Sequence, residues 1–148
     1  MNVLLGIGNF DKGDDGVGSY VARHLNAEGW MGIECGTAPE NFTGVVRQQS
    51  PERIVMVDAT DMGLAPGAIR RIARDQVEDV GIGTHMLPLY HLIDYLAEVT
   101  TDIVLIGIQP KSVGYGEPLC EEVQAAAEAV AEFVATDRMD EIEPIADS

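Results

Sequence analysis

The chain begins with VLLGIG at residues 3–8, a short apolar run that ends at a glycine. Runs of this length that are bounded by glycine are typical of buried strands. A polar loop follows at residues 9–14, and apolar side chains then recur at helical spacing from Val17 to about Glu28, before Gly29. A glycine just after the last periodic residue is a helix stop signal. This succession of strand, loop and helix predicts the first unit of an α/β fold.

The same alternation continues along the rest of the chain. Residues 53–58 are predicted to form a strand whose centre, residues 54–57, is a continuous apolar run, which is typical of strands in sheets that are covered on both faces. The link from this strand to a short strand at residues 68–73 has no room for a crossover helix, so we expect one antiparallel strand, at an exposed edge. The fold class is therefore α/β, with a mostly parallel sheet between two layers of helices. The other predicted strands are 32–36 and 102–108, and the other predicted helices are 40–49, 84–96 and 119–135.

The length of 148 residues indicates a single α/β domain, which we place at residues 1–136. The remaining residues, 137–148, hold five acids and show little periodicity. Segments of this composition bury too little apolar surface to fold on their own. We therefore expect residues 137–148 to form an acidic, mobile tail.

Acids dominate the charged side chains, with 25 Asp and Glu against nine Lys and Arg and a formal net charge of −16. A field of this sign repels phosphate backbones, so we expect no nucleic-acid partner; it favours a cation or a basic segment of a partner. No apolar run reaches the roughly 18 residues of a membrane span, and no basic segment precedes an apolar stretch as in a signal peptide. We expect a cytoplasmic protein without membrane insertion.

Acidic residues also follow the predicted strands, at the sheet edge where ligands of open α/β folds gather. Asp14 and Asp15 follow the first strand, Asp58 ends the third, and His85 lies at the start of the third helix. Two carboxylates and an imidazole from separate loops form a ligand set that suits zinc, nickel, manganese or iron. Simpler roles stay open: the acid pair could cap the first helix, Asp58 could bind the loop after its strand, and His85 could have no ligand.

Two other interpretations of this edge are weaker. Gly6 and Gly8 begin a GxG pattern, but Asp11 stands where a dinucleotide-binding loop has its third glycine. Cys35 could act as a nucleophile beside His85, but neighbouring acids raise the pKa of a thiol instead of lowering it. We therefore expect Cys35 to be a buried structural residue.

Longer motifs occur in order along the chain: GIGN at 6–9 with GDDGVG at 13–18, GTAPEN at 36–41, VDATDMGL at 57–64, THMLPL at 84–89 and LIGIQP at 105–110. Together they resemble the nickel-iron hydrogenase maturation endopeptidases. They are most similar to the branch that processes hydrogenases of the formate-hydrogenlyase (hydrogenase 3) type. The resemblance covers residues 2–135, which is nearly the whole predicted domain.

The resemblance implies a three-layer α/β/α sandwich of the phosphorylase/hydrolase-like type, with a five-stranded, mostly parallel sheet and one antiparallel strand. It implies an aspartyl-type endopeptidase that removes the C-terminal extension of a nickel-loaded hydrogenase large-subunit precursor. Asp15, Asp58 and His85 fall on the family's metal-contacting positions, with a role shared between catalysis and metal recognition. The nickel would be supplied by the substrate and would not be held tightly by the enzyme.

One departure and two rival functions stay open. The second strand of the family ends in Asp-Gly-Gly, whereas this chain has Glu34, Cys35 and Gly36, so no catalytic role is carried onto Glu34. One rival function is a non-cleaving nickel-sensing chaperone or checkpoint module that docks on the same large subunit. The other is a self-sufficient zinc peptidase that acts on small peptides.

Overall fold

Strands and helices alternate along the part of the chain that the computed structural model describes, residues 1–79 and 89–146. The described strands are β1 (Asn2–Ile7), β2 (Trp30–Gly36), β3 (Ile54–Ala59), β4 (Ile69–Ile72) and β5 (Ile103–Ile108). The described helices are α1 (Val17–His24), α2 (Thr43–Gln49), α3 (Leu89–Leu96) and α4 (Glu121–Ala135). Short 3₁₀ turns lie at η1 (Gly13–Gly16), η2 (Pro39–Phe42), η3 (Arg74–Asp79) and η4 (Met139–Glu141).

The five strands form one sheet in the order β2-β1-β3-β5-β4. Among the described strands, β4 alone runs antiparallel to its neighbour, β5. The predicted antiparallel strand is therefore confirmed, and its reason is the short link at residues 60–68, which has no room for a crossover helix. β4 lies at an edge as predicted, but it pairs with β5 because β5 enters the sheet between β3 and β4.

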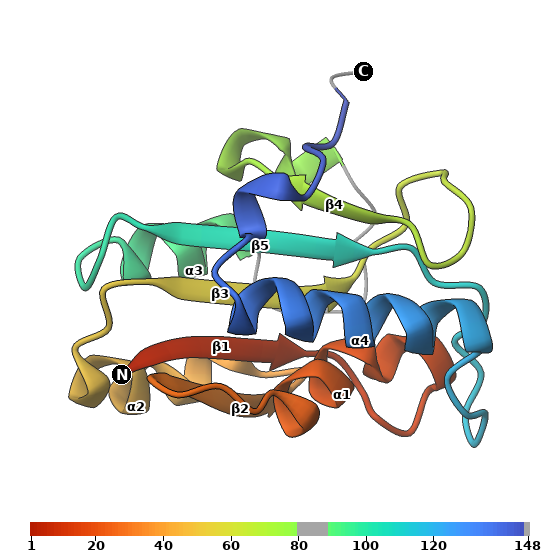
Figure 1. Cartoon of the computed structure of the whole chain (residues 1–148), viewed down its shortest axis with the longest axis horizontal. Coiled ribbons are helices and arrows are strands. Elements are labelled where there is room, and N and C mark those ends of the chain that lie inside the picture. The colour runs from red at the N-terminus through yellow and green to blue at the C-terminus, as the bar shows by residue number, and fades with distance from the viewer. Residues whose placement is uncertain (80–88, 147–148) are drawn as a thin grey trace.

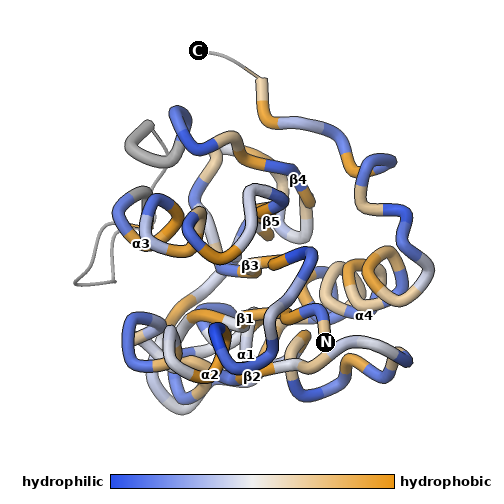
Figure 2. The backbone as a smooth tube through the Cα atoms, turned by 90° about the vertical axis from the view of Figure 1, so that its left-hand side faces the viewer, coloured by the Kyte–Doolittle hydropathy of each residue, from blue (hydrophilic) through white to orange (hydrophobic). Residues whose placement is uncertain are grey.

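Helices cover both faces of this sheet (Figure 1). α1 and α4 pack on one face, where Val21 and Val130 belong to the same apolar cluster as Val57 of β3. α2 and α3 pack on the other face, where Leu92 clusters with Met56. Figure 2, which looks along the strands, shows α3 and α4 on opposite sides of the sheet. β3 is buried along its whole length, and the predicted three-layer α/β/α sandwich is confirmed.

Two helix boundaries differ from the prediction. α1 ends at His24 instead of about Glu28, since Leu25 already has an extended backbone with ψ of 119°. The helix predicted from residue 40 begins with the η2 turn, and the α-helix itself starts at Thr43. The predicted start of the third helix, residues 84–88, lies outside the described residues. None of the described helices is long and apolar enough to cross a membrane.

The C-terminal segment differs more strongly from its prediction as a mobile tail from residue 137. Residues 142–145 lie along β4, and Figure 1 shows the C-terminal segment running from the end of α4 to the edge of the sheet. Met139 is 2% exposed and Ile142 is 3% exposed. The backbone of Arg71 pairs with the segment through two hydrogen bonds of 2.9 and 2.8 Å. Apolar residues at every third position thus bury one side of a segment whose overall composition is acidic.

The start of α1 lies directly against two strands. Gly18 has no side chain, and a Cβ there would lie 2.4 Å from the carbonyl oxygens of both Ile7 and Val57. Any larger residue at this position would push the helix off the sheet. The η1 turn, which immediately precedes α1, is therefore held at the carboxyl ends of β1 and β3.

Candidate active site

Asp15 lies in the η1 turn and is 4% exposed. Its Oδ2 accepts a hydrogen bond from the backbone N–H of Asn9 at 2.9 Å. Gly8 allows the chain to fold back this closely, because its φ is +130° and a Cβ there would lie 1.9 Å from the carbonyl oxygen of Asp15. Gly8 and Asn9 together therefore fix Asp15 at the end of β1.

Asp58 lies near the end of β3 and is completely buried, at 0% exposure. Side chains alternate along a strand, so Asp58 shares the face of Ile54 and Met56, which α2 and α3 cover. Its partner in register on β5 is Gly107, which has no side chain. Burial of a carboxylate is strongly unfavourable unless it is compensated, and such groups gather at functional sites. Asp58 is therefore a strong candidate for a role in the site.

The structure brings Asp15 and Asp58 to the same end of adjacent strands. β1 and β3 are parallel neighbours, with Gly6 in register with Val57. Asp58 follows Val57 directly, and Asp15 lies one helical turn before Gly18, which touches the Val57 carbonyl. The predicted meeting of two carboxylates at this edge therefore has a structural basis in the contact between α1 and the sheet.

His85 lies outside the described residues, so its predicted place beside the two acids stays a prediction. The helix that follows it in the chain, α3, packs Leu89 and Leu92 into the same cluster as Met56. This is the face of the sheet that Asp58 shares. Within residues 1–79 and 89–146, no three His, Cys, Asp or Glu side chains gather closely enough to hold a metal ion.

Asp14 has a different environment from its neighbour. It is 1% exposed, and its carboxylate accepts hydrogen bonds from the backbone N–H groups of Lys111 (2.8 Å), Ser112 (3.0 Å) and Cys120 (2.8 Å). The Cys120 thiol donates a further bond at 3.3 Å. Burial raises the pKa of Asp14, but the hydrogen bonds together outweigh burial, so this pKa lies below its usual value. No side chain caps α1, so the capping role left open by the sequence is replaced by an anchoring role toward the β5–α4 loop.

Gln109 is a residue of this edge to which the sequence analysis gave no role. It is 7% exposed, and its Oε1 accepts hydrogen bonds from the N–H groups of Met62 (2.6 Å) and Leu64 (3.3 Å). Its Nε2 donates to Asp61 Oδ1 at 3.3 Å. Gln109 therefore orders the loop that follows Asp58. The available signal was a single amide side chain directly after an apolar strand.

Glu34 and Cys35, at the end of β2, take no part in this arrangement. Glu34 forms a two-pronged ion pair with Arg23 of α1, at 2.8 and 3.3 Å. Cys35 is 4% exposed, and burial together with the negative charge of Glu40 raises the pKa of its thiol to about 12. A thiol with this pKa is protonated at neutral pH and is a poor nucleophile. The expectation of a buried structural cysteine agrees with this environment.

A family model for the hydrogenase maturation proteases matches residues 17–137. The hydrogenase 3 maturation protease of Escherichia coli K12 is 41% identical over 133 residues, covering 87% of this chain and 85% of that protein. A putative hydrogenase maturation protease of Methanocaldococcus jannaschii is 33% identical, covering 85% of this chain and 81% of that protein. A crystal structure of the hydrogenase 3 maturation protease superposes with a TM-score of 0.91 at 37% identity, covering 99% of this chain and 97% of that chain. A NiFe hydrogenase maturation protease from Thermococcus kodakarensis superposes with a TM-score of 0.81 at 34% identity, covering 93% and 91%.

These likenesses extend over nearly the whole chain and agree with the fold derived above. They confirm the predicted enzyme class, an endopeptidase of hydrogenase maturation, over the non-cleaving module. The chain therefore belongs to the hydrogenase maturation protease family.

Proposed function

We propose that this protein removes the C-terminal extension of a nickel-loaded hydrogenase large-subunit precursor, in the cytoplasm, and so completes its maturation. One observation carries the proposal. Asp15 and Asp58, at 4% and 0% exposure, lie at the carboxyl ends of adjacent parallel strands in a hydrogenase maturation protease fold. Carboxylates buried in this way are typical of groups that are kept for chemistry.

Nickel enters the proposal as part of the substrate. The carboxylate oxygens of Asp15 and Asp58 and a ring nitrogen of His85 are ligand types that suit a divalent first-row metal. Such a set is incomplete, so it binds free metal poorly and binds well when the precursor supplies the remaining ligands. Cleavage would then depend on nickel insertion, and the protease would cleave only a precursor whose nickel is already in place.

The reaction is the hydrolysis of one peptide bond, in which water adds to the carbonyl carbon and the C–N bond then breaks. The substrate's nickel would polarise this carbonyl or activate the water. Asp15 and Asp58 would orient the metal, and one of the two carboxylates would accept a proton from the attacking water and pass it to the leaving nitrogen as the C–N bond breaks, which makes the enzyme aspartyl-type. The net charge of −16 favours the approach of a cationic centre.

Incubation of the protein with nickel-loaded and nickel-free precursor, followed by intact mass spectrometry, tests the proposal. We expect a shortened large subunit and a released peptide from the loaded precursor alone. Equal cleavage of the nickel-free precursor would contradict the recognition of nickel. Binding of the precursor without any cleavage would favour the checkpoint module. As a control, chelator added to the protease alone and then removed should leave activity unchanged, because the metal arrives with the precursor.

A further inference from the structure

Two loops meet where the strands end, and hydrogen bonds join them in both directions. One is the β1–α1 loop with its η1 turn, and the other is the β5–α4 loop, residues 109–120. The N–H of Asp14 donates to the carbonyl of Ser112 at 2.8 Å, and the N–H of Gly116 donates to the carbonyl of Asp11 at 2.9 Å. The position of one loop therefore constrains the position of the other.

The carboxylate of Asp14 is the centre of this contact. Its Oδ2 accepts bonds from the Lys111 and Ser112 N–H groups and from the Cys120 thiol, and its Oδ1 accepts the Cys120 N–H. All of these donors belong to the β5–α4 loop, and they enclose the carboxylate so that Asp14 is 1% exposed. Hydrogen bonds to an ionised acceptor are shorter and stronger than neutral ones. We refer to Asp14, Lys111, Ser112 and Cys120 as the Asp14 clasp.

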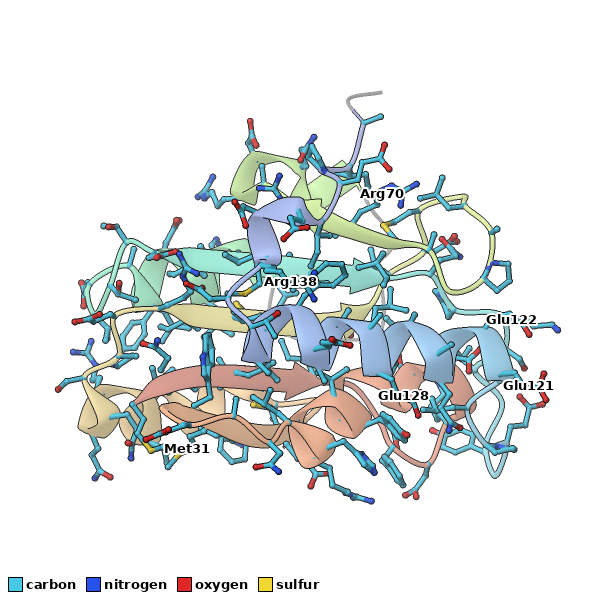
Figure 3. The ribbon with its side chains drawn as sticks, viewed as in Figure 1. Met31, Arg70, Glu121, Glu122, Glu128 and Arg138 are labelled. Carbon is cyan, nitrogen blue, oxygen red and sulfur yellow. The ribbon has the colours of Figure 1, made fainter. Side chains whose placement is uncertain are left out.

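The clasp acts on the residue next to it in the chain. The Cα atoms of Asp14 and Asp15 are about 3.8 Å apart, as in any trans peptide. Cys120 is the N-cap residue of α4, so the clasp ties the η1 turn to a helix of 15 residues that packs on the sheet. Figure 3 shows Glu121 and Glu122, which begin α4, at the end of the molecule to which β1, β3 and β5 point. Asp15 is therefore held from one side by the clasp and from the other by its own bond to Asn9.

We propose that Asp14 is a positioning residue, which holds Asp15 in place through the β5–α4 loop and does not touch the substrate. The inference rests on the proposed function, in which Asp15 contacts the nickel of the precursor. A displacement of a reacting group by about 1 Å lowers a rate by about a hundredfold. Loss of the clasp should therefore slow cleavage although Asp15 itself is still present.

Two test variants and two controls distinguish the effect of losing the clasp from the effects of losing a negative charge or the Cys120 thiol alone. Asp14→Asn keeps one acceptor oxygen but sets an amide NH₂ group against a donor of the loop. Cys120→Pro removes both donors of Cys120 from the other side, and the φ of −71° at this position suits proline. Two controls are Cys120→Ala, which removes the thiol alone, and Asp11→Asn, which removes an exposed negative charge from the same loop.

Amide hydrogen exchange of the free protein tests the positioning role without any precursor. The sensitive amide is that of Asn9, which donates to Asp15 and not to Asp14. We expect it to exchange at least about tenfold faster in Asp14→Asn and in Cys120→Pro, because local opening exposes it more often. Asp11→Asn should keep the parental rate, and Cys120→Ala, which loses only the weak thiol donor and keeps the backbone donor, should change the rate by less than either test variant. Faster exchange in the β5–α4 loop with an unchanged Asn9 amide would overturn the proposal, because Asp14 would then serve that loop alone.

Cleavage of nickel-loaded precursor, measured well below the melting temperature of each variant, is the second test. For Asp14→Asn we expect kcat to fall about 10- to 100-fold while KM stays within about twofold, with a smaller loss for Cys120→Pro. Parental kcat in Asp14→Asn, or an equal loss in Asp11→Asn, would overturn the proposal. If Asp14→Asn does not fold, Cys120→Pro decides the question. If the parent protein cleaves no precursor, the proposed function fails, and the Asn9 amide still decides the positioning role.

Discussion

The carboxylates beside the central strands, β1, β3 and β5, are held in opposite ways at the two ends of the sheet. At the amino ends of β3 and β5, Arg53 pairs with Asp102 at 2.9 Å, in a partly exposed ion pair. At the carboxyl ends, Asp14 and Asp15 are buried, and in the part of the chain that the structure describes they pair with no Lys or Arg. Their donors are backbone N–H groups and one thiol.

The ion pair at the amino ends and the buried carboxylates at the carboxyl ends serve different purposes, stability in the first case and function in the second. An exposed ion pair is neutralised by its partner and contributes only about 0.2–1 kcal/mol to stability. A carboxylate that no basic side chain neutralises acts more strongly on a cation in a medium of low dielectric constant than an exposed carboxylate does in water. The amino ends of these strands are therefore arranged for stability. At their carboxyl ends Asp14 anchors the β5–α4 loop, and Asp15 has no Lys or Arg partner among the described residues that would compete with a cationic ligand.

The largest effect should come from removing charge at the carboxyl ends. Asp15→Asn keeps the shape of the side chain and an acceptor for the Asn9 N–H. Loss of a group that supports a metal ligand lowers activity by roughly 10–100-fold. Because Asp15 is proposed to contact the metal itself, we expect the cleavage rate of Asp15→Asn to fall by more than this. The same is expected for Asp58→Asn and for His85→Ala. The free energy of unfolding of Asp15→Asn, measured in urea, should stay within about 1 kcal/mol of the parent value. Full activity in any one variant would remove that residue from the site.

The next largest effect should appear where the C-terminal segment covers β4. Ending the chain after Asp137 removes Met139 and Ile142, which are 2% and 3% exposed. Burial of a side chain of this size contributes ~1.5–3 kcal/mol as an upper bound, so we expect the free energy of unfolding to fall by about 3 kcal/mol. The folded truncated protein should still cleave precursor, because β5 separates β4 from β3. The exposed change Asp140→Ala serves as the control, and a loss of kcat on truncation would place the segment in the site.

A smaller effect is expected at the amino ends. Arg53→Gln removes the ion pairs with Asp102 (2.9 Å) and Asp137 (2.5 Å), in which the arginine side chain is 32% exposed. Because partly exposed pairs are screened by solvent, we expect a loss of about 1 kcal/mol in the free energy of unfolding. The difference from the parent should shrink in 1 M salt, where the Debye length is about 3 Å. We expect kcat of Arg53→Gln to be unchanged. A loss of activity without a loss of stability would contradict the assignment of the amino ends to stability and the carboxyl ends to function.

The fold was largely predictable because its signals are local. The first four residues of β3, 54–57, are an uninterrupted apolar run, and the structure buries the whole strand on both faces. The antiparallel pairing of β4 followed from a link too short for a helix. The C-terminal segment was not predicted, because its spacing of apolar residues only has meaning once an open strand edge at Arg71 is available to pair with it.

The candidate site was predictable only in its coarse features. Strand ends gave Asp14, Asp15 and Asp58 as candidates, because a topological rule brings such residues to one edge. Position after the strand could not separate Asp14 from Asp15, because the donors to Asp14 lie 97 to 106 residues further along the chain. Only the family resemblance singled out Asp15. The role of Gln109 was not predictable for the same reason, since the N–H group of Met62 that it binds is 47 residues away in the chain. Local patterns carry no information about such distant pairs.

The smallest effect on cleavage is expected at Cys35, which lies at the carboxyl end of β2 but has an unreactive thiol. Burial, with the negative charge of Glu40, raises the pKa of its thiol to about 12. At pH 8 its thiolate fraction is then roughly a thousandfold below that of an ordinary thiol of pKa near 8.5, and alkylation should be slower in proportion. In a Cys120→Ala background, we expect iodoacetamide to leave native Cys35 unmodified while it labels the unfolded chain.

The same pKa determines how Cys35 affects stability and activity. The folded thiol keeps its proton above about pH 9, where the unfolded thiol releases it, so the free energy of unfolding should decrease as the pH rises from about 9 toward 12. Cys35→Ser should flatten this part of the pH profile, because a serine hydroxyl does not ionise there. The variant should keep most of its cleavage activity at neutral pH, since the hydroxyl can still donate to the carbonyl of Ile33, which the thiol contacts at 3.7 Å. A folded Cys35→Ser protein that binds precursor and does not cleave it would show that a thiol, and not the carboxylate pair, performs the chemistry at this end of the sheet.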